Sequence, residues 1–184
     1  MKTGIIVPGF LVILFIVLSI AVLPASEITI ITDQDYFPRV LKSLGEAKQS
    51  IQMMMFEASY YEKHPNTPSN VLIKELILAR KRGLKVEVIL EVRKGGQDRT
   101  TQRNRNTGKM LSNGGVEVIY DPSNVTTHAK LIIIDGKKCI LGSTNWTYHS
   151  LSFNHEVDVL VSSREVAKKL QDYFHQVKKS VNKN

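Results

Sequence analysis

His128 and Lys130 lie two residues apart, at the beginning of the apolar run Leu131-Ile132-Ile133-Ile134. In a β-strand, residues two apart point to the same face, so this spacing places an imidazole beside a fixed cation. An imidazole, with an unperturbed pKa of about 6.5, can act as a nucleophile or as an acid without a metal. The pair predicts nucleophilic or acid–base chemistry on an anionic group.

A second polar cluster follows the apolar run and consists of Gly142, Ser143 and Asn145. The dipeptide Asp135-Gly136 between the two clusters is a strong turn signal. Glycine lets the backbone approach a ligand closely, and serine and asparagine supply neutral hydrogen-bonding groups. Lysine, hydroxyl and amide groups around one histidine predict a pocket for a phosphate.

The spacing of these residues resembles the signature of the phospholipase D superfamily, H-x-K-x4-D-x6-G-S-x-N. All six specified positions are matched, by His128, Lys130, Asp135, Gly142, Ser143 and Asn145. The resemblance extends over most of residues 27–180, and in motif number and size the chain is similar to the small single-motif bacterial endonucleases of that superfamily. It implies a phosphodiesterase that needs no metal.

The resemblance also implies a role for each residue of the pocket. His128 is then the nucleophile that forms a phosphohistidine, and Lys130 and Asn145 hold the non-bridging phosphate oxygens. Ser143 assists in the same pocket. Glu156 matches the downstream acidic position that orients a catalytic histidine.

The aspartate of the signature, Asp135, is implied to support the site structurally rather than to react. No cofactor and no metal are expected. Cys139 is the only cysteine, which excludes a disulfide within the chain and a cysteine-based zinc site, and it fits a buried core position.

One chain carries only half of the chemistry expected for such an enzyme. In an in-line displacement the attacking and leaving atoms lie on opposite sides of phosphorus, so one histidine attacks while another protonates the leaving oxygen. None of the other histidines has a lysine two residues on: His64, His149, His155 and His175. The missing half-site and the resemblance together predict a two-fold homodimer that brings two copies of His128 to a shared axis.

The charge of the chain suits a polyanionic substrate. The formal net charge is +8, and between Leu78 and Met110 ten basic residues face three acidic ones, a net of +7. We interpret the polar segment 95–108 as a mobile loop that forms a phosphate-tracking rim. The residues expected to contact substrate are Arg93, Lys94, Arg99, Arg103 and Arg105, together with Lys130, Ser143 and Asn145.

Three functions compete at this stage. A nuclease that cuts DNA or RNA with little sequence preference is favoured, because phosphate contacts position a chain without reading its bases. A phospholipase would be served by the hydrophobic leader, which would hold the site near lipid. A non-catalytic nucleic-acid binder is disfavoured by the intact set of His128, Lys130, Asn145 and Glu156.

The segments that must position these residues alternate between the hydrophobic period of a strand and that of a helix. This predicts an α/β domain with a mixed sheet flanked by helices on both faces. Strands are expected at 27–32, 50–58, 84–92, 116–120, 129–134, 138–141 and 156–162. Helices are expected at 36–48, from an N-cap at Ser69-Asn70 to Gly83, at 109–113 and at 165–178.

The amino-terminal segment is apolar and free of charge from residue 4 to residue 23. Twenty residues at ~1.5 Å each cover about the ~30 Å of bilayer hydrocarbon, which predicts a hydrophobic helix. Residues 1–26 are therefore expected to be a signal peptide or a membrane anchor, followed by a catalytic domain at 27–184. Lys2 before the run and acidic residues after it predict export, to a periplasmic, extracellular or membrane-anchored location.

Overall fold

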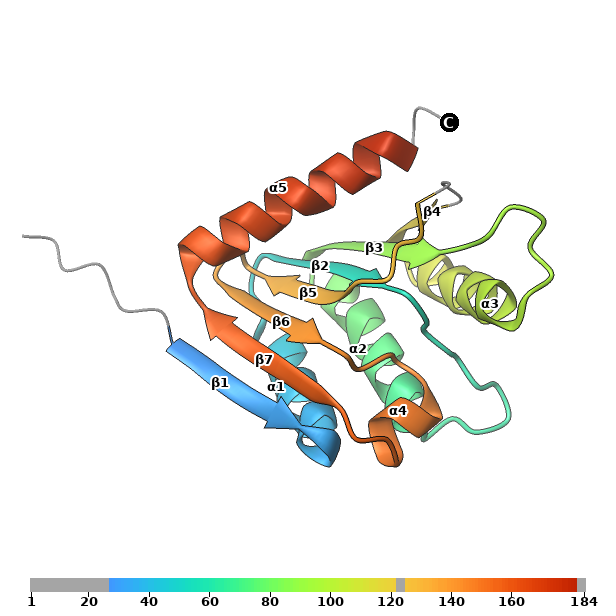
Figure 1. The fold of residues 1–184 in the computed structure, drawn as a ribbon, viewed down its shortest axis with the longest axis horizontal. Coiled ribbons are helices and arrows are strands. Elements are labelled where there is room, and N and C mark those ends of the chain that lie inside the picture. The colour runs from blue at the N-terminus through green and yellow to red at the C-terminus, as the bar shows by residue number, and fades with distance from the viewer. Residues whose placement is uncertain (1–26, 122–124, 182–184) are drawn as a thin grey trace, which may run out of the picture.

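The computed structural model describes residues 27–121 and 125–181. Its centre is one seven-stranded sheet with the order β1-β7-β6-β5-β2-β3-β4 (Figure 1). The strands are β1 (Glu27–Thr32), β2 (Ser50–Met55), β3 (Lys85–Glu91), β4 (Glu117–Asp121), β5 (Lys130–Ile134), β6 (Lys138–Gly142) and β7 (Val157–Ser162). The helices are η1 (Asp33–Asp35), α1 (Tyr36–Glu46), α2 (Pro68–Lys81), α3 (Arg99–Asn113), α4 (Tyr148–Ser152) and α5 (Arg164–Val181).

The sheet is mixed because its two halves are connected differently. Strands β2, β3 and β4 are parallel, and α2 and α3 supply the crossovers that parallel neighbours require. Strands β5, β6, β7 and β1 pair antiparallel. As a result, the carboxyl ends of β2, β3 and β4 share one edge of the sheet with the beginning of β5 and the end of β6.

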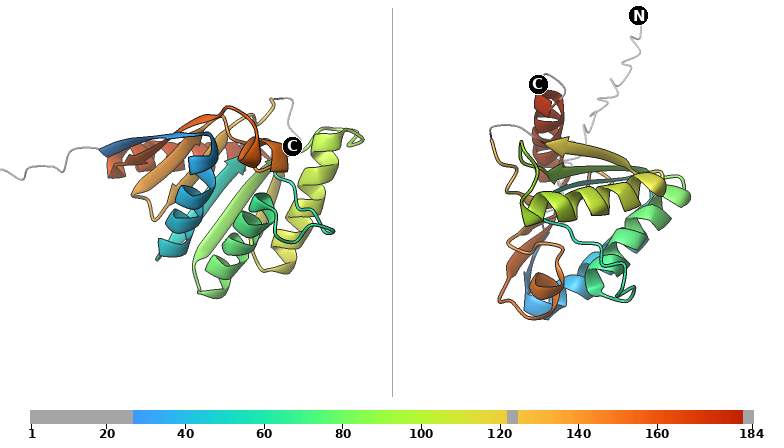
Figure 2. Two further views of the ribbon diagram at one scale, coloured as in Figure 1. Left: turned by 90° about the horizontal axis from the view of Figure 1, so that it is seen from below. Right: turned by 90° about the vertical axis from the view of Figure 1, so that its right-hand side faces the viewer.

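Helices cover both faces of the sheet, as expected from the sequence. Figure 2 shows α1, α2 and α3 on one face and α5 on the other. Alternate residues of β2 serve the two cores: Met53 and Met55 pack in the larger core under α1 and α2, and Met54 packs with Phe174 of α5. The expected amino-terminal helix lies outside the described residues, and no helix within 27–121 and 125–181 is long and apolar enough to cross a membrane.

The expected mobile loop at 95–108 and the short helix at 109–113 are wrong, because α3 is one helix from Arg99 to Asn113. Asp98 caps it by accepting a hydrogen bond from the backbone N–H of Thr101. The buried side of α3 is mainly Thr101, Asn104, Thr107 and Gly108, so it has no apolar period. Hydrophobic periodicity therefore could not reveal it.

The polar face of α3 holds the segment that follows β2. Asn104 accepts a hydrogen bond from the N–H of Ala58 and donates to the carbonyls of Phe56 and Glu91, at 2.7–2.8 Å. Thr107 donates to the carbonyl of Ala58 and accepts from the N–H of Tyr60. The strand expected at 50–58 thus ends at Met55, and residues 56–60 are fixed by side chains of α3.

Smaller differences from the expected elements have local causes. Helix α2 begins at Pro68 after an extended Thr67, rather than at a cap formed by Ser69-Asn70. Asn70 is buried in the first turn and hydrogen-bonds both backbone groups of Tyr61. The short α4 was not predicted, because five residues offer too few positions for a helical period.

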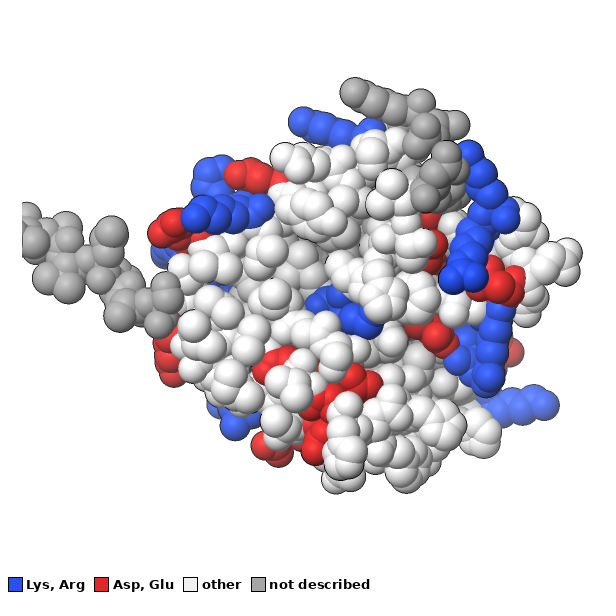
Figure 3. Space-filling model, viewed as in Figure 1, with Lys and Arg blue, Asp and Glu red and all other residues white. Residues whose placement is uncertain are grey.

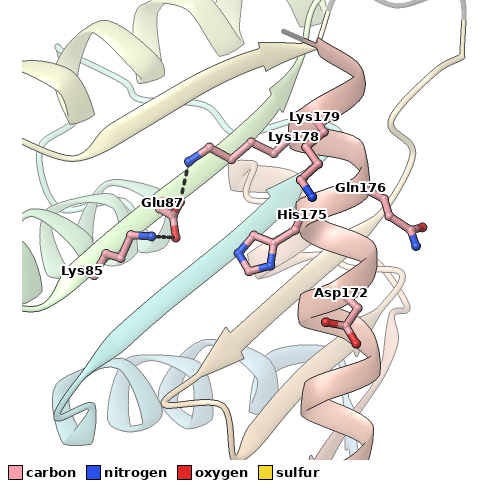
Figure 4. Close-up of a pocket in the computed structure, with 7 residues that line it drawn as sticks. All are labelled: Lys85, Glu87, Asp172, His175, Gln176, Lys178 and Lys179. Carbon is pink, nitrogen blue, oxygen red and sulfur yellow. Dashed lines mark hydrogen bonds and ion pairs between the residues drawn. The ribbon is translucent and has the colours of Figure 1, made fainter. Parts of the chain in front are cut away.

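A hydrogen-bonded polar network lies between α5 and the sheet. The buried carboxylate of Glu87 binds Lys85 and Lys178, with N–O distances of 2.9 and 2.6 Å. Burial raises the pKa of Glu87, but the two ammonium groups outweigh it and the net shift is downward. These residues line a cavity that also contains His175 (Figure 4). None of the six motif residues lines this cavity.

Candidate active site

The structure brings His128, Lys130 and Phe56 into direct contact at the shared edge of the sheet. The Nζ atom of Lys130 lies 3.5 Å from both ring nitrogens of His128 and donates to the carbonyl of His128 at 2.8 Å. The rings of Phe56 and His128 lie 4.5 Å apart, and the same ammonium lies 4.9 Å from the centre of the Phe56 ring. His128 itself is exposed, so a ligand can reach its ring.

Lys130 combines a fixed position with partial burial. Burial lowers the pKa of its ammonium, and the negative charge of Glu156 opposes that shift. Lys130 is the first residue of β5 and Glu156 directly precedes β7, and the sheet brings these two strand ends together. Lys130 is thus a cation in a site where electrostatic interactions are stronger than in water.

Ser143 and Glu156 form the second part of the site, directly after the end of β6 and directly before the beginning of β7. Ser143 Oγ donates to Glu156 Oε2 at 2.5 Å and accepts from the N–H of Val157 at 3.1 Å. Asn154 donates to the other carboxylate oxygen of Glu156 at 3.0 Å. Glu156 is only 8% exposed, and these contacts fix its side chain beside Ser143.

Gly142 is required by the close packing of β6 against β7. A Cβ atom at this position would lie 2.3 Å from Asp158 Oδ1 and 2.4 Å from the carbonyl of Val157. The buried carboxylate of Asp158 occupies that space. It accepts hydrogen bonds from the hydroxyl of Thr144 and, at 3.4 Å, from the backbone N–H of Thr144. Any larger residue would displace the turn that carries Ser143.

Asn145 presents its amide group at the same edge. Its Oδ1 atom is buried and has no hydrogen-bond partner among the described residues. An unpaired buried oxygen costs roughly 1–3 kcal/mol, so this acceptor is available to a donor group, whereas the Nδ2 group of the same amide is the part that can donate to a phosphate oxygen. The adjacent Trp146 fixes its backbone, donating to the carbonyl of Glu57 and accepting from the N–H of Ser59.

Two buried carboxylates hold the residue that precedes His128. Thr127 donates from its N–H to Glu91 at 2.7 Å and from its hydroxyl to Asp121 at 2.5 Å. Both acids are 2% exposed. Burial raises the pKa of Glu91, and the neighbouring Asp121 adds to that shift. The ends of β3 and β4 thus set the path by which the chain enters β5.

Asp135 lies at the opposite end of β5 from Lys130. Its carboxylate accepts hydrogen bonds from the backbone N–H groups of Lys48, Gln49 and Ser50, at 2.7–3.2 Å. Burial raises its pKa, but these bonds outweigh burial and the net shift is downward. Five residues of strand separate the two ends by about 16 Å. Asp135 therefore ties the β5–β6 turn to the beginning of β2 and makes no contact in the pocket.

The expected basic rim is divided by the fold. Arg93, Lys94 and Arg99 are exposed on the segment entering α3 and on its first turn. Arg103 instead pairs with Glu57, and Arg105 lies over the ring of Tyr120. Figure 3 shows Lys and Arg side chains gathered on the side of the molecule where α3 lies. Of the remaining basic residues of the +7 segment, Lys109 lies in α3, and four lie at the opposite edge of the sheet: Arg80, Lys81, Arg82 and Lys85.

Residues 40–178 match the family described as cardiolipin synthase, PLD-like domain. The chain belongs to the phospholipase D superfamily. It has the fold of the phosphodiesterase-like hydrolases of that superfamily. The residues of the signature lie at the sheet edge described above, except Asp135, which lies at the opposite edge.

Known proteins show the same relationship. The mitochondrial cardiolipin hydrolase of Danio rerio is 29% identical over 142 residues, which are 77% of this chain and 56% of that protein. A cardiolipin synthase of Listeria monocytogenes is 24% identical over 134 residues, 73% of this chain and 26% of that protein. The chain thus spans about half, or less, of the length of these relatives.

Solved structures of the phospholipase D superfamily share the fold. Nuc from Salmonella typhimurium, a phospholipase D family member, superimposes with a TM-score of 0.71 at 21% identity, over 84% of this chain and 95% of that one. NucT from Helicobacter pylori superimposes with a TM-score of 0.65 at 17% identity, over 85% and 98% of the two chains. The architecture is shared over nearly the full length of both.

Sequence reasoning missed several residues of this phospholipase D-like site. Phe56 and Glu57 follow the buried strand β2 directly, and Asn154 lies two residues before Glu156. A signal for the first pair was present, since functional side chains gather beyond the carboxyl ends of parallel strands. No local pattern connects Glu91 or Asp121 with His128, because only the fold brings these segments together.

Proposed function

We propose that the chain is a metal-independent phosphodiesterase that hydrolyses nucleic-acid backbones with little sequence preference. The observation that carries the proposal is the contact between Lys130 and the exposed imidazole of His128, next to the Ser143–Glu156 pair. A cation, a hydroxyl and an amide then surround one nucleophilic ring. This donor set suits a tetrahedral phosphate.

In the proposed reaction, a ring nitrogen of His128 attacks phosphorus, forming a P–N bond as the P–O bond to the leaving group breaks. Lys130 and Asn145 bind the non-bridging oxygens and stabilise the charge that develops on them. A second histidine gives its proton to the leaving oxygen. Water then attacks the phosphohistidine and gives a proton to the second histidine as the P–N bond breaks, which releases the phosphate-bearing product and restores both imidazoles.

The second histidine is proposed to be His128 of a twin subunit in a two-fold homodimer. Glu156 supports this arrangement, since its carboxylate binds Ser143 and Asn154 and lies in the pocket where it could orient an incoming ring. The other described histidines do not carry a lysine partner of the same kind. His155, for example, is fully exposed beside Asp33.

An exposed apolar face adjoins the pocket and supports the dimer. Ile28 and Ile30 of β1 and Val157 of β7 are 60–63% exposed on the face of the sheet that carries α5. The backbone of Val157 binds Ser143 directly, so this face is continuous with the site. Figure 3 shows a broad area without charged side chains on this side. Contiguous exposed apolar residues of this kind mark association surfaces.

A phospholipase is the second candidate, and the relatives named cardiolipin hydrolase and cardiolipin synthase favour it. We place it second because exposed cations, Arg93, Lys94 and Arg99, stand at the end of β3 and the beginning of α3, near the pocket. A row of cations follows a repeating phosphate chain better than a single headgroup.

The direct test is an activity assay of the full chain in EDTA with DNA, RNA and phospholipid vesicles in parallel. We expect cleavage of nucleic acid that His128→Ala abolishes and that His155→Ala, a matched exposed histidine, leaves intact. Hydrolysis of vesicles alone would replace the proposal with the phospholipase. Activity that depends on a divalent metal would contradict the mechanism.

Mixed dimers test the shared site. If each reaction needs both copies of His128, dimers formed from wild-type and His128→Ala chains are inactive. Activity should then fall with the square of the wild-type fraction after unfolding and co-refolding of the mixture. A linear fall would show that each protomer works alone.

A further inference from the structure

A cluster of aromatic rings lies beside the phosphate pocket and takes no part in the proposed reaction. Tyr148, His149 and Phe153, in and directly after α4, form three mutual ring contacts with centroids 5.4–5.9 Å apart. Tyr148 is 40% exposed and Phe153 is 66% exposed. Large rings are rarely left this accessible in a group without a function for the surface.

The cluster continues into a hollow of about 390 Å³ lined by Tyr61, His64, Thr67 and Tyr148. The hydroxyl of Tyr61 accepts a hydrogen bond from the N–H of Tyr148 at 3.2 Å, which joins the loop after β2 to α4. The rings of Tyr148, His149 and Phe153 meet edge to face or tilted, with interplanar angles of 49–79°. We call Tyr61, His64, Tyr148, His149 and Phe153 the aromatic platform.

Direct connections place the aromatic platform next to the phosphate pocket. Asn145 lies three residues before Tyr148, and the backbone between them is paired with residues 57–59. On the other side, Asn154 follows Phe153 and donates to Glu156, which binds Ser143. A ligand held at Ser143 or Asn145 therefore has its neighbouring parts beside these rings.

We propose that the aromatic platform stacks unpaired bases of a single-stranded nucleic acid, and this rests on the proposed function. Each phosphate of a nucleic acid is flanked by bases, so a phosphate in the pocket brings bases to its border. Rings bind every base through its π-face, without reading sequence, and only unpaired bases expose that face. Single strands should therefore be preferred to duplexes.

A membrane surface is the less suitable occupant. The hollow is lined by tyrosine, histidine and threonine, all of which carry polar groups, rather than by the aliphatic side chains that enter hydrocarbon. Lys63 also lines a second hollow that shares His64 and Tyr148, and its ammonium suits a phosphate of the same strand.

Binding measured with the full-length His128→Ala protein tests the proposal without cleavage. The probes are a fluorescent 12-nucleotide single strand, an abasic strand of equal length and charge, and a blunt duplex. We expect the single strand to bind about ten- to hundredfold more tightly than the abasic strand. Adding Tyr148→Ala and Phe153→Ala should bring that ratio close to one, whereas Phe153→Trp should keep it. Leu78→Ala on α2, where the exposed fraction lies between those of the two rings, is the matched control and should not change the ratio.

Three results would overturn the proposal. Equal affinity for the single strand and the abasic strand would show that the rings do not contact bases. Loss of binding to anionic phospholipid vesicles, with oligonucleotide binding unchanged, would assign the rings to a membrane. Dissociation of an oligomer in the double variant, seen by light scattering, would assign them to a subunit contact. Failure of the wild-type chain to cut nucleic acid would instead reject the proposed function, since that assay is independent of the binding ratio.

Discussion

At the scale of single residues, the site depends on how Lys130 is held. Its ammonium touches the ring and the backbone carbonyl of His128 and the ring of Phe56, so its position is set by the beginning of its own strand and by the segment after β2. Burial lowers its pKa, and Glu156 counteracts this from across the pocket. The charge of Lys130 is thus coupled to an acid that sequence spacing alone does not pair with it.

Glu156→Gln should therefore shift the alkaline limb of the pH–rate profile to lower pH. Removing the carboxylate removes the interaction that raises the pKa of Lys130, so the lysine loses its proton at a lower pH. The measurement is kcat/KM against pH for the wild type and the variant on one oligonucleotide. Glu165→Gln, an exposed acid of α5, is the control and should leave the limb in place. If the alkaline limb does not move in Glu156→Gln, the carboxylate of Glu156 does not raise the pKa of Lys130.

At the scale of elements, the site is held by polar contacts from α3 and from the turn after β5. Helix α3 clamps residues 56–58, which carry the ring against His128. Asp135 clamps the start of β2 through three backbone amides. Buried polar contacts of this kind fix geometry, and they cost stability when one partner is removed.

Asn104→Ala should destabilise the fold by roughly 2–4 kcal/mol, because it leaves one N–H and two carbonyls without their side-chain partner. The measurement is denaturant unfolding, with Asn106→Ala as the control on the exposed side of the same helix. We also expect lower activity below the unfolding midpoint, since Phe56 would lose its support. Equal stability of the two variants would show that α3 does not clamp this segment.

Asp135→Asn should cost roughly 1–3 kcal/mol at pH 7, because the charged acceptor of three N–H groups is lost. The folded pKa of Asp135 lies below its ordinary value, so its stabilisation is complete above the unfolded pKa, about 3.9, and is lost as pH falls through the folded value. The difference between wild type and variant should shrink between about pH 5 and pH 3. Asp172→Asn, an exposed acid, should show no such dependence.

At the scale of the whole molecule, the sheet leaves one region of its α5 face uncovered. Helix α5 packs on the central strands, and β1 and β7 remain exposed beside it (Figure 1). The pocket opens at the edge of this region, because Val157 belongs to both. A proposed twin that covers the apolar face would also bring its own histidine to the pocket.

Ile30→Glu should dissociate the proposed dimer and lower activity at least about tenfold, because a charge would be buried in the contact. Light scattering and activity would be measured over the same range of protein concentration. Leu78→Glu, similarly exposed on α2, is the control and should remain dimeric. An active Ile30→Glu monomer would reject both the interface and the shared site.

The sequence by itself determined the superfamily and most of the fold. The spacing of His128, Lys130, Ser143 and Asn145 was sufficient to indicate the superfamily, and the strands were predictable because their buried residues are apolar. The alternation of strands and helices was sufficient for a mixed sheet with helices on both faces. Helix α3 was not predicted from the sequence, because its buried face hydrogen-bonds polar groups of other segments and hydrophobic periodicity detects only apolar burial.

Only the tertiary structure decided which residues meet. It brought Phe56, Glu91, Asp121 and Asn154 to the site from four separate segments, and it paired Asp135 with the backbone of residues 48–50. It also divided the basic segment between two edges of the sheet and exposed an aromatic platform beside the pocket. Contacts between residues far apart in sequence depend on strand order and crossovers, and no local pattern of residues records them.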